Sequence, residues 1–125
     1  MKQKGNILII PDPHASPDYD NKRFTALGNL IVDKQPHIVL CLGDMADMPS
    51  LSSYDKGTKG FEGRRYKKDV ASTIDAQVKL FEPIKNLNAN KRKRNFSQYN
   101  PMLHTCLGNH EDRIARATNF SPELE

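Results

Sequence analysis

Three short apolar segments constrain the fold of this chain more than any other feature of its sequence. They run from Ile7 to Ile10, from His37 to Leu42 and from Met102 to Leu107, and each ends at a turn rich in Gly, Pro, Asp or Asn. The first segment does not alternate with polar residues, as a strand with one solvated face would. The pattern predicts strands buried on both faces, as in a parallel sheet.

The stretches between these strands show helical periodicity. One helix is expected from about Asn21 to Lys34, with Asp20 or Asn21 capping its first turn. A second helix begins near Tyr66, and Pro83 either kinks or ends it. The predicted face of this second helix consists of Tyr66, Val70, Ile74, Gln77 or Val78, and Phe81.

A polar, basic connector from Asn88 to Asn100 precedes the third strand, and a third helix is expected from His110 to Ala117. The resulting order is β-α-β-α-β-α. It predicts an α/β fold in which helices pack against an open parallel sheet.

Length and composition fit one small folded domain. The 125 residues, 37% of them apolar and 27% charged, exclude a disordered or low-complexity chain. The longest apolar run, Ile7 to Ile10, is too short to cross a bilayer, so we expect a cytoplasmic protein without a membrane partner. Cys41 and Cys106 are expected to be small buried hydrophobes with reduced thiols. The net charge of +4 suits a polyanionic partner without requiring one.

Side chains that can bind metal ions follow each predicted strand: first Asp12 and His14, then Asp44 and Asp47, then Asn109 and His110. The carboxyl ends of parallel strands face a common crevice, so these side chains should converge despite their separation in sequence. Carboxylate, imidazole and amide groups suit divalent Mn, Fe, Zn or Mg.

The same residues form three motifs, D-x-H, G-D-x-x-D and G-N-H-E. They read Asp12-Pro13-His14, Gly43-Asp44-Met45-Ala46-Asp47 and Gly108-Asn109-His110-Glu111. In this order, each after an apolar strand, they resemble the calcineurin-like metallophosphoesterase superfamily over residues 6 to 117. The resemblance implies a parallel-sheet core like the N-terminal half of that superfamily's α/β sandwich, and a hydrolase acting on a phosphodiester or phosphomonoester.

The resemblance also implies a metal centre. Asp12 and His14 would hold a first ion, Asp44 would bridge two ions, and Asn109 would bind the second. The ions would be divalent, with Mn favoured and Fe, Zn, Ni or Mg as alternatives. A hydroxide held between them would attack phosphorus in line.

Further residues would act on the substrate. By the same resemblance, His110 would lie beside the phosphoryl group, stabilising charge or protonating the leaving oxygen, and Asp47 would orient it. Asn109 and His110, at a helix start, are candidate substrate contacts, and so is Arg113.

Two features depart from the superfamily's pattern. Its members continue with a lone His and a G-H-x-H segment that complete both metal sites, whereas this sequence ends at Glu125. The remaining histidines, His37 and His104, lie upstream in predicted strands and cannot substitute. Met48 stands where the Ser/Thr phosphatase branch has Arg, which disfavours that branch. The domain, residues 1–125, is therefore expected to be incomplete at its C-terminus and weak or inactive alone, with an apolar sheet edge or face exposed.

Three functions stay open at this point. The chain is a fragment of a longer phosphoesterase, or half of a split enzyme completed by a second polypeptide or by self-association, or an inactive metal-binding or nucleic-acid-binding module. The run from Lys91 to Arg94 could contact DNA or RNA, although a solvated basic loop is favoured. The segment containing Gly57, Gly60 and Gly63 is either a phosphate-contacting lid or a flexible loop.

Overall fold

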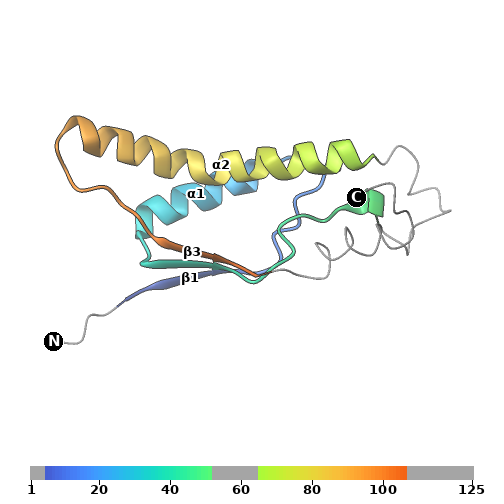
Figure 1. The fold of residues 1–125 in the computed structure, drawn as a ribbon, viewed down its shortest axis with the longest axis horizontal. Helices are drawn as coiled ribbons and strands as arrows, with labels where there is room; N and C mark the ends of the chain where they lie inside the picture. The colour runs from blue at the N-terminus through green and yellow to red at the C-terminus, as the bar shows by residue number, and fades with distance from the viewer. Residues whose placement is uncertain (1–4, 52–64, 107–125) are drawn as a thin grey trace.

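The computed structural model describes residues 5–51 and 65–106, which form a three-stranded parallel sheet with two helices on one face (Figure 1). The elements are β1 (Ile7–Ile10), α1 (Lys22–Lys34), β2 (Ile38–Cys41), the 3-10 helix η1 (Pro49–Leu51), α2 (Tyr66–Lys93) and β3 (Met102–Thr105). This confirms the α/β fold and the order of the first five predicted elements. The predicted third helix, His110 to Ala117, lies outside the described residues.

The strands lie in the order β1-β2-β3 and are aligned in register. Ile10 at the end of β1 pairs with Cys41 at the end of β2, and Cys41 pairs with Thr105 of β3. The three carboxyl ends therefore lie at the same edge of the sheet, as the site prediction requires.

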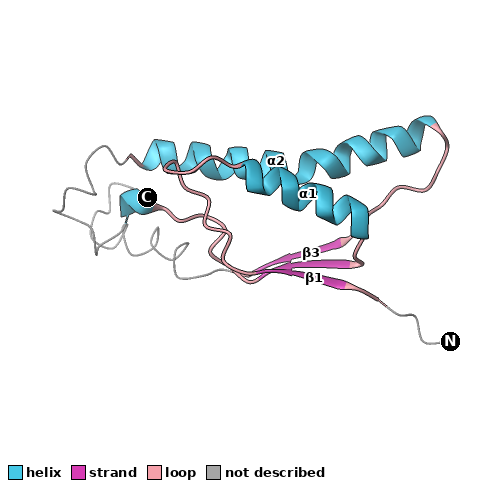
Figure 2. Cartoon of the chain, turned by 180° about the vertical axis from the view of Figure 1, so that it is seen from behind, coloured by secondary structure: helices cyan, strands magenta, loops and turns pink. Residues whose placement is uncertain are grey.

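Helices α1 and α2 lie together on one face of the sheet (Figure 2). The core lies between the two layers and contains Ile10, Val39, Phe24, Ile31, Ala76, Leu80 and Ile84 among its buried residues. On the opposite face Ile7 and Ile9 are 58% and 54% exposed, and Met102 is 57% exposed. The prediction of strands buried on both faces is thus wrong for β1 and β3, whereas the expected exposed apolar face is confirmed.

Helix α1 begins and ends close to its predicted bounds. The N-cap residue is Asn21, whose side chain makes no capping hydrogen bond; the Asp20 carboxylate, one residue earlier, accepts the N–H of Lys22, the first helical residue (3.0 Å). The Asn21 amide instead donates to the Ser72 carbonyl (3.0 Å) and the Asp75 carboxylate (2.9 Å) of α2. At the other end, Gln35 takes a left-handed conformation that ends the helix.

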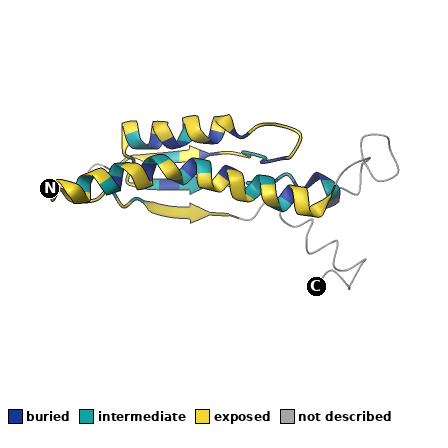
Figure 3. Cartoon of the chain, turned by 90° about the horizontal axis from the view of Figure 1, so that it is seen from above, coloured by how far each residue is buried: buried dark blue, intermediate teal, exposed yellow. Residues whose placement is uncertain are grey.

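Helix α2 differs from its prediction in two ways. It continues through Pro83 to Lys93, so the segment from Asn88 to Lys93 is helical and not part of the connector. Its buried residues are Asp69, Ala76, Leu80, Ile84 and Asn88, whereas Ile74 and Val78 of the predicted face are exposed. Figure 3 shows buried and exposed positions interspersed along the helices. The pattern failed because the larger apolar residues of the first turns face outward while a small Ala and two polar residues face inward.

The connector after α2 is fixed by an amide pair. Asn88 donates to the Tyr99 carbonyl (2.9 Å) and accepts the Tyr99 N–H (2.8 Å). The Tyr99 hydroxyl donates to the Pro36 carbonyl, and burial raises the pKa of this phenol above its ordinary value. These contacts direct the chain into β3. His104 in this strand and Cys106 just after it are both exposed, contrary to expectation, whereas Cys41 is buried as predicted.

Within the two described ranges, no helix combines the length and the hydropathy needed to span a bilayer.

Candidate metal centre

Two loops at the carboxyl edge of the sheet build the site. The first follows β1 and carries Asp12 and His14; the second follows β2 and carries Asp44 and Asp47. The His14 N–H donates to the Asp44 carbonyl (2.9 Å). The Ala15 N–H donates to the Met45 carbonyl (2.7 Å), and the Asp47 N–H donates to the Ala15 carbonyl (2.9 Å). The loops thus continue the parallel pairing of the sheet beyond its strands.

Left-handed backbone conformations gather in these loops. The described residues include six non-glycine positions with positive φ, and four of them are Asp12 (38°), His14 (49°), Asp44 (54°) and Met48 (51°). Such conformations cost about 1–3 kcal/mol each and persist where the surroundings enforce them, commonly at functional sites. The site loops therefore hold their side chains in directions that a relaxed chain would not choose.

The backbone brings three of the predicted ligands together. Asp12, His14 and Asp44 each offer one ligand atom, and these atoms lie within 4.8 Å of one another. The His14 Nε2 lies 3.8 Å from Asp44 Oδ2, and on its other side His14 Nδ1 lies 3.9 Å from Asp47 Oδ1. Asp12 is exposed and His14 and Asp44 are half-buried, so the cluster is open to solvent on one side.

These three groups fit a divalent cation. With bonds of about 2.0–2.2 Å, ligands of one ion lie within about 4.4 Å of each other, so the cluster needs only a small contraction to close on an ion. Two carboxylates and one imidazole form a mixed oxygen and nitrogen set suited to Mn, Fe or Zn. The open side leaves room for water or substrate.

Asp47 lies beside His14 in this structure. The sequence analysis assigns Asp47 to orient His110, but His110, Asn109 and Arg113 lie outside the described residues. Among the described residues, the imidazole that Asp47 faces is that of His14. The Gly57, Gly60 and Gly63 segment also lies outside the described residues.

Two residues that no motif singled out support the loops. Arg23 of α1 donates from Nη2 to the Pro13 and His14 carbonyls, each at 2.7 Å. Asp69, in the first turn of α2, accepts the Ser50 N–H (3.0 Å) and the Ser50 hydroxyl of η1. No sequence signal for these roles exists, because both depend on contacts with backbone groups or with a serine in a distant loop.

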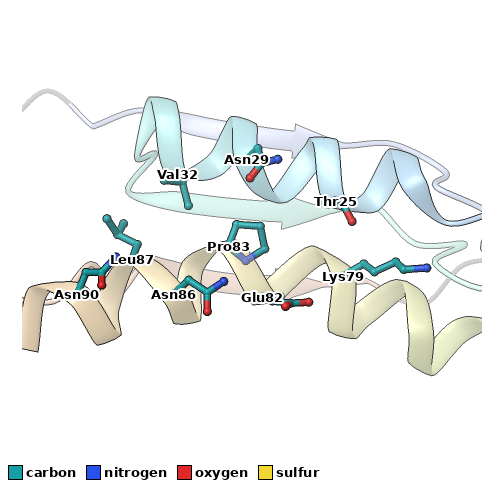
Figure 4. A pocket seen from close by; sticks show the side chains of 9 residues that line it. All are labelled: Thr25, Asn29, Val32, Lys79, Glu82, Pro83, Asn86, Leu87 and Asn90. Atoms are coloured by element: carbon teal, nitrogen blue, oxygen red, sulfur yellow. The ribbon is translucent and has the colours of Figure 1, made fainter.

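One groove of the molecule is separate from the site. A groove of about 490 Å³ lies between α1 and α2 (Figure 4). Thr25, Asn29 and Val32 line it from α1, and Lys79, Glu82, Pro83, Asn86, Leu87 and Asn90 line it from α2. None of the predicted site residues lines this groove.

A parallel α/β sheet with a cation-fitting Asp-His-Asp cluster at the carboxyl ends of its strands defines a class of metal-binding α/β proteins. Within that class, the calcineurin-like phosphoesterase family matches residues 5–124 of the chain. The chain therefore belongs to this family. The resemblance inferred from the three motifs is thereby confirmed, and with it membership of a family of hydrolases.

The chain is also similar to the Gene 54 protein of Mycobacterium phage L5. The two are 29% identical over 119 residues, which is 94% of this chain and 41% of the phage protein. The chain thus spans about two fifths of the length of this curated relative.

Proposed function

We propose that the chain carries the first metal-binding half of a phosphoesterase that hydrolyses a phosphodiester or phosphomonoester. The observation that carries the proposal is the convergence of Asp12, His14 and Asp44 at the carboxyl edge of the sheet in a calcineurin-like phosphoesterase. When bound, divalent ions, Mn in the first place, supply positive charge beside the phosphoryl oxygens and activate the attacking water.

Each site residue has its own role in this proposal. Asp12 and His14 would hold the first ion, and Asp44, on the second loop, would be the ligand shared with a second ion that Asn109 would also hold. His110 stabilises or protonates the leaving oxygen. Asp47 orients an imidazole, and Asn109, His110 and Arg113 contact the phosphate.

Manganese titration of the 125-residue chain tests this proposal. We expect calorimetry to detect Mn²⁺ binding, and Asp44→Asn to weaken it by more than ~100-fold, because removal of a direct ligand should exceed the 10–100-fold effect of an outer contact. Asp33→Asn, which removes the same charge from the exposed end of α1, is the matched control and should bind like the wild type. Absence of Mn²⁺ binding, or equal affinity in the two variants, would contradict the proposal.

Hydrolysis of an aryl phosphodiester and of an aryl phosphomonoester then tests the reaction. Turnover should require added Mn²⁺ and stop on chelation, and it should be weak for this chain alone. His110→Ala should keep the Mn²⁺ affinity and lose turnover, since His110 is assigned to the substrate and not to the metal. Activity that survives exhaustive chelation would overturn the metal-dependent mechanism.

Nucleic acid is a candidate substrate because the chain is basic and the run from Lys91 to Arg94 lies at the solvent-facing end of α2. This end of α2, orange in Figure 1, lies over the amino ends of the strands, away from the metal loops. Changing all four residues to Ser should leave hydrolysis of the small diester intact. If the run contacts DNA or RNA, the change should also weaken binding and flatten its salt dependence, because each phosphate contact releases counterions. Unchanged binding with an unchanged salt slope would identify the run as solvated surface.

A further inference from the structure

Arg23 connects α1 to the first metal loop. Its Nη2 donates to two successive carbonyls, those of Pro13 and His14, both at 2.7 Å, and its Nη1 donates to the Asp20 carbonyl at 3.3 Å. The guanidinium carbon lies 4.8 Å from the centre of the Phe24 ring. Phe24 is a fully buried core residue, so the guanidinium is placed by the rigid part of the fold.

The loop that Arg23 contacts needs such support. Asp12 and His14 both have positive φ, at 38° and 49°, with Pro13 between them. The N–H groups of His14 and Ala15 have their hydrogen-bond partners in the second loop, where they donate to the carbonyls of Asp44 and Met45. The carbonyls on the other side of the same turn are those that Arg23 binds.

We propose that Arg23 is a positioning residue for the metal centre. By binding the Pro13 and His14 carbonyls together, it holds the left-handed turn in which the Asp12 and His14 side chains point to the same place as Asp44. The inference deepens the proposed function and rests on it, since the turn matters because its side chains bind a cation.

Charge alone predicts the opposite behaviour, which makes the inference testable. A guanidinium near a cation site repels the cation, so its removal by itself should tighten binding. If Arg23 acts through the loop geometry, its removal should weaken binding instead. The sign of the change in affinity therefore separates the two effects.

The experiment compares Arg23→Met with Lys22→Met. Both substitutions remove one positive charge and keep an unbranched stem on the exposed first turn of α1. Among the described residues, the Lys22 side chain forms no hydrogen bond or ion pair with the loop that Arg23 binds. We expect Arg23→Met to weaken Mn²⁺ binding by about 10-fold, in the range of outer-contact changes at metal sites, and Lys22→Met to leave it unchanged or slightly tighter.

A second readout needs no metal. In the metal-free chain, hydrogen exchange of the His14 and Ala15 amides should be about 10-fold faster in Arg23→Met than in Lys22→Met, because the loop opens more often. The amide of Gln35, which donates to Ile31 at the far end of α1, should exchange equally in both and so reports that the fold is intact.

The outcomes separate the two proposals. Weaker Mn²⁺ binding with faster loop exchange in Arg23→Met alone supports the role of Arg23. Equal or tighter Mn²⁺ binding in Arg23→Met, with a wild-type chain that binds Mn²⁺, overturns this role and leaves the proposed function standing. A wild-type chain that binds no Mn²⁺ contradicts the proposed function, and equal loop exchange in the two variants then also rejects Arg23 as the residue that holds the loop.

Discussion

Among the described residues, Asp69 is the one buried carboxyl group, and it lies outside the metal cluster. It is 1% exposed, Ser50 donates to one of its oxygens, and its Oδ1 makes no hydrogen bond within the described ranges. Burial raises the pKa of Asp69 above its ordinary value; the Ser50 hydrogen bonds oppose this, while the charges of Asp47 and Asp18 add to it. Ionisation of Asp69 therefore lowers the stability of the folded chain.

This raised pKa makes stability depend on pH with a definite sign. The folded chain holds the Asp69 proton more tightly than the unfolded chain, so the contribution is fully present below the unfolded pKa, about 4, and is lost as the pH rises through the folded pKa. Asp69→Asn keeps an oxygen that accepts from Ser50 but cannot ionise. Relative to wild type, its free energy of unfolding in urea should rise as the pH increases above about 4. Asp33→Asn, which removes an exposed carboxyl group, is the control. A difference in free energy of unfolding between Asp69→Asn and wild type that does not change with pH would contradict this prediction.

Residues of the site divide into those that the sequence could predict and those it could not. Asp12, His14 and Asp44 were predictable because topology alone brings the carboxyl ends of parallel strands together. Arg23 and Asp69 were not predictable, because their partners are two carbonyls and a serine whose positions depend on the finished loops. Ligands can thus be inferred from their order along the chain, whereas the residues that hold them in place require the structure.

At the scale of elements, the contact between α1 and α2 depends on Gly28. A Cβ at this position would lie 2.4 Å from the Leu80 carbonyl oxygen and 3.0 Å from the Pro83 ring, so the helices approach closely there. Pro83 therefore packs against α1 at the point where the sequence indicates a kink or an end. Its packing, together with the burial of Leu80 and Ile84, accounts for a helix that continues through a proline.

Gly28→Ala should therefore destabilise the fold. In an exposed helix, Gly to Ala stabilises by about 1 kcal/mol, but here the methyl group meets backbone and a proline ring, and overpacking costs about 1–3 kcal/mol. Asn29→Ala, at the exposed neighbouring position on α1, is the control and should be neutral or slightly stabilising. Urea unfolding followed by circular dichroism measures both, and a more stable Gly28→Ala would show that the helices can separate without cost.

Prediction at this scale succeeded where local signals agree with packing. The bounds of α1 follow from Asp20 and from the Gln35-Pro36 end, and β1 and β2 follow from their apolar runs. The buried face of α2 could not be predicted, because apolar periodicity favours Ile74 and Val78 while the fold buries Asp69 and Asn88 through their hydrogen bonds. Polar residues of α2 that hydrogen-bond to other segments are thus buried where the apolar pattern predicts an exposed face.

At the scale of the whole molecule, the two-layer arrangement leaves one face of the sheet open. Register places Ile7 beside Ile38 and Ile9 beside Leu40, and Ile38 beside Met102, so these side chains form an apolar surface that reaches across three strands. On β3, His104 lies beside Leu40 and is the polar member of the same face. Ile7, Ile9 and Met102 on this surface are each more than half exposed. A contiguous apolar surface of this kind favours association in water.

The 125-residue chain should therefore associate through this surface. Sedimentation of the wild type should show a mass that rises with concentration. Ile9→Lys, which places a charge within this surface on the edge strand β1, should shift the chain toward monomer because burying an unpaired ammonium is costly. Leu30→Lys adds the same charge at a 41% exposed position on α1, on the other side of the molecule, and should associate like the wild type. Identical sedimentation of the two variants would show that the open face of the sheet does not drive association. A wild-type chain that stays monomeric at high concentration would contradict the prediction of association itself.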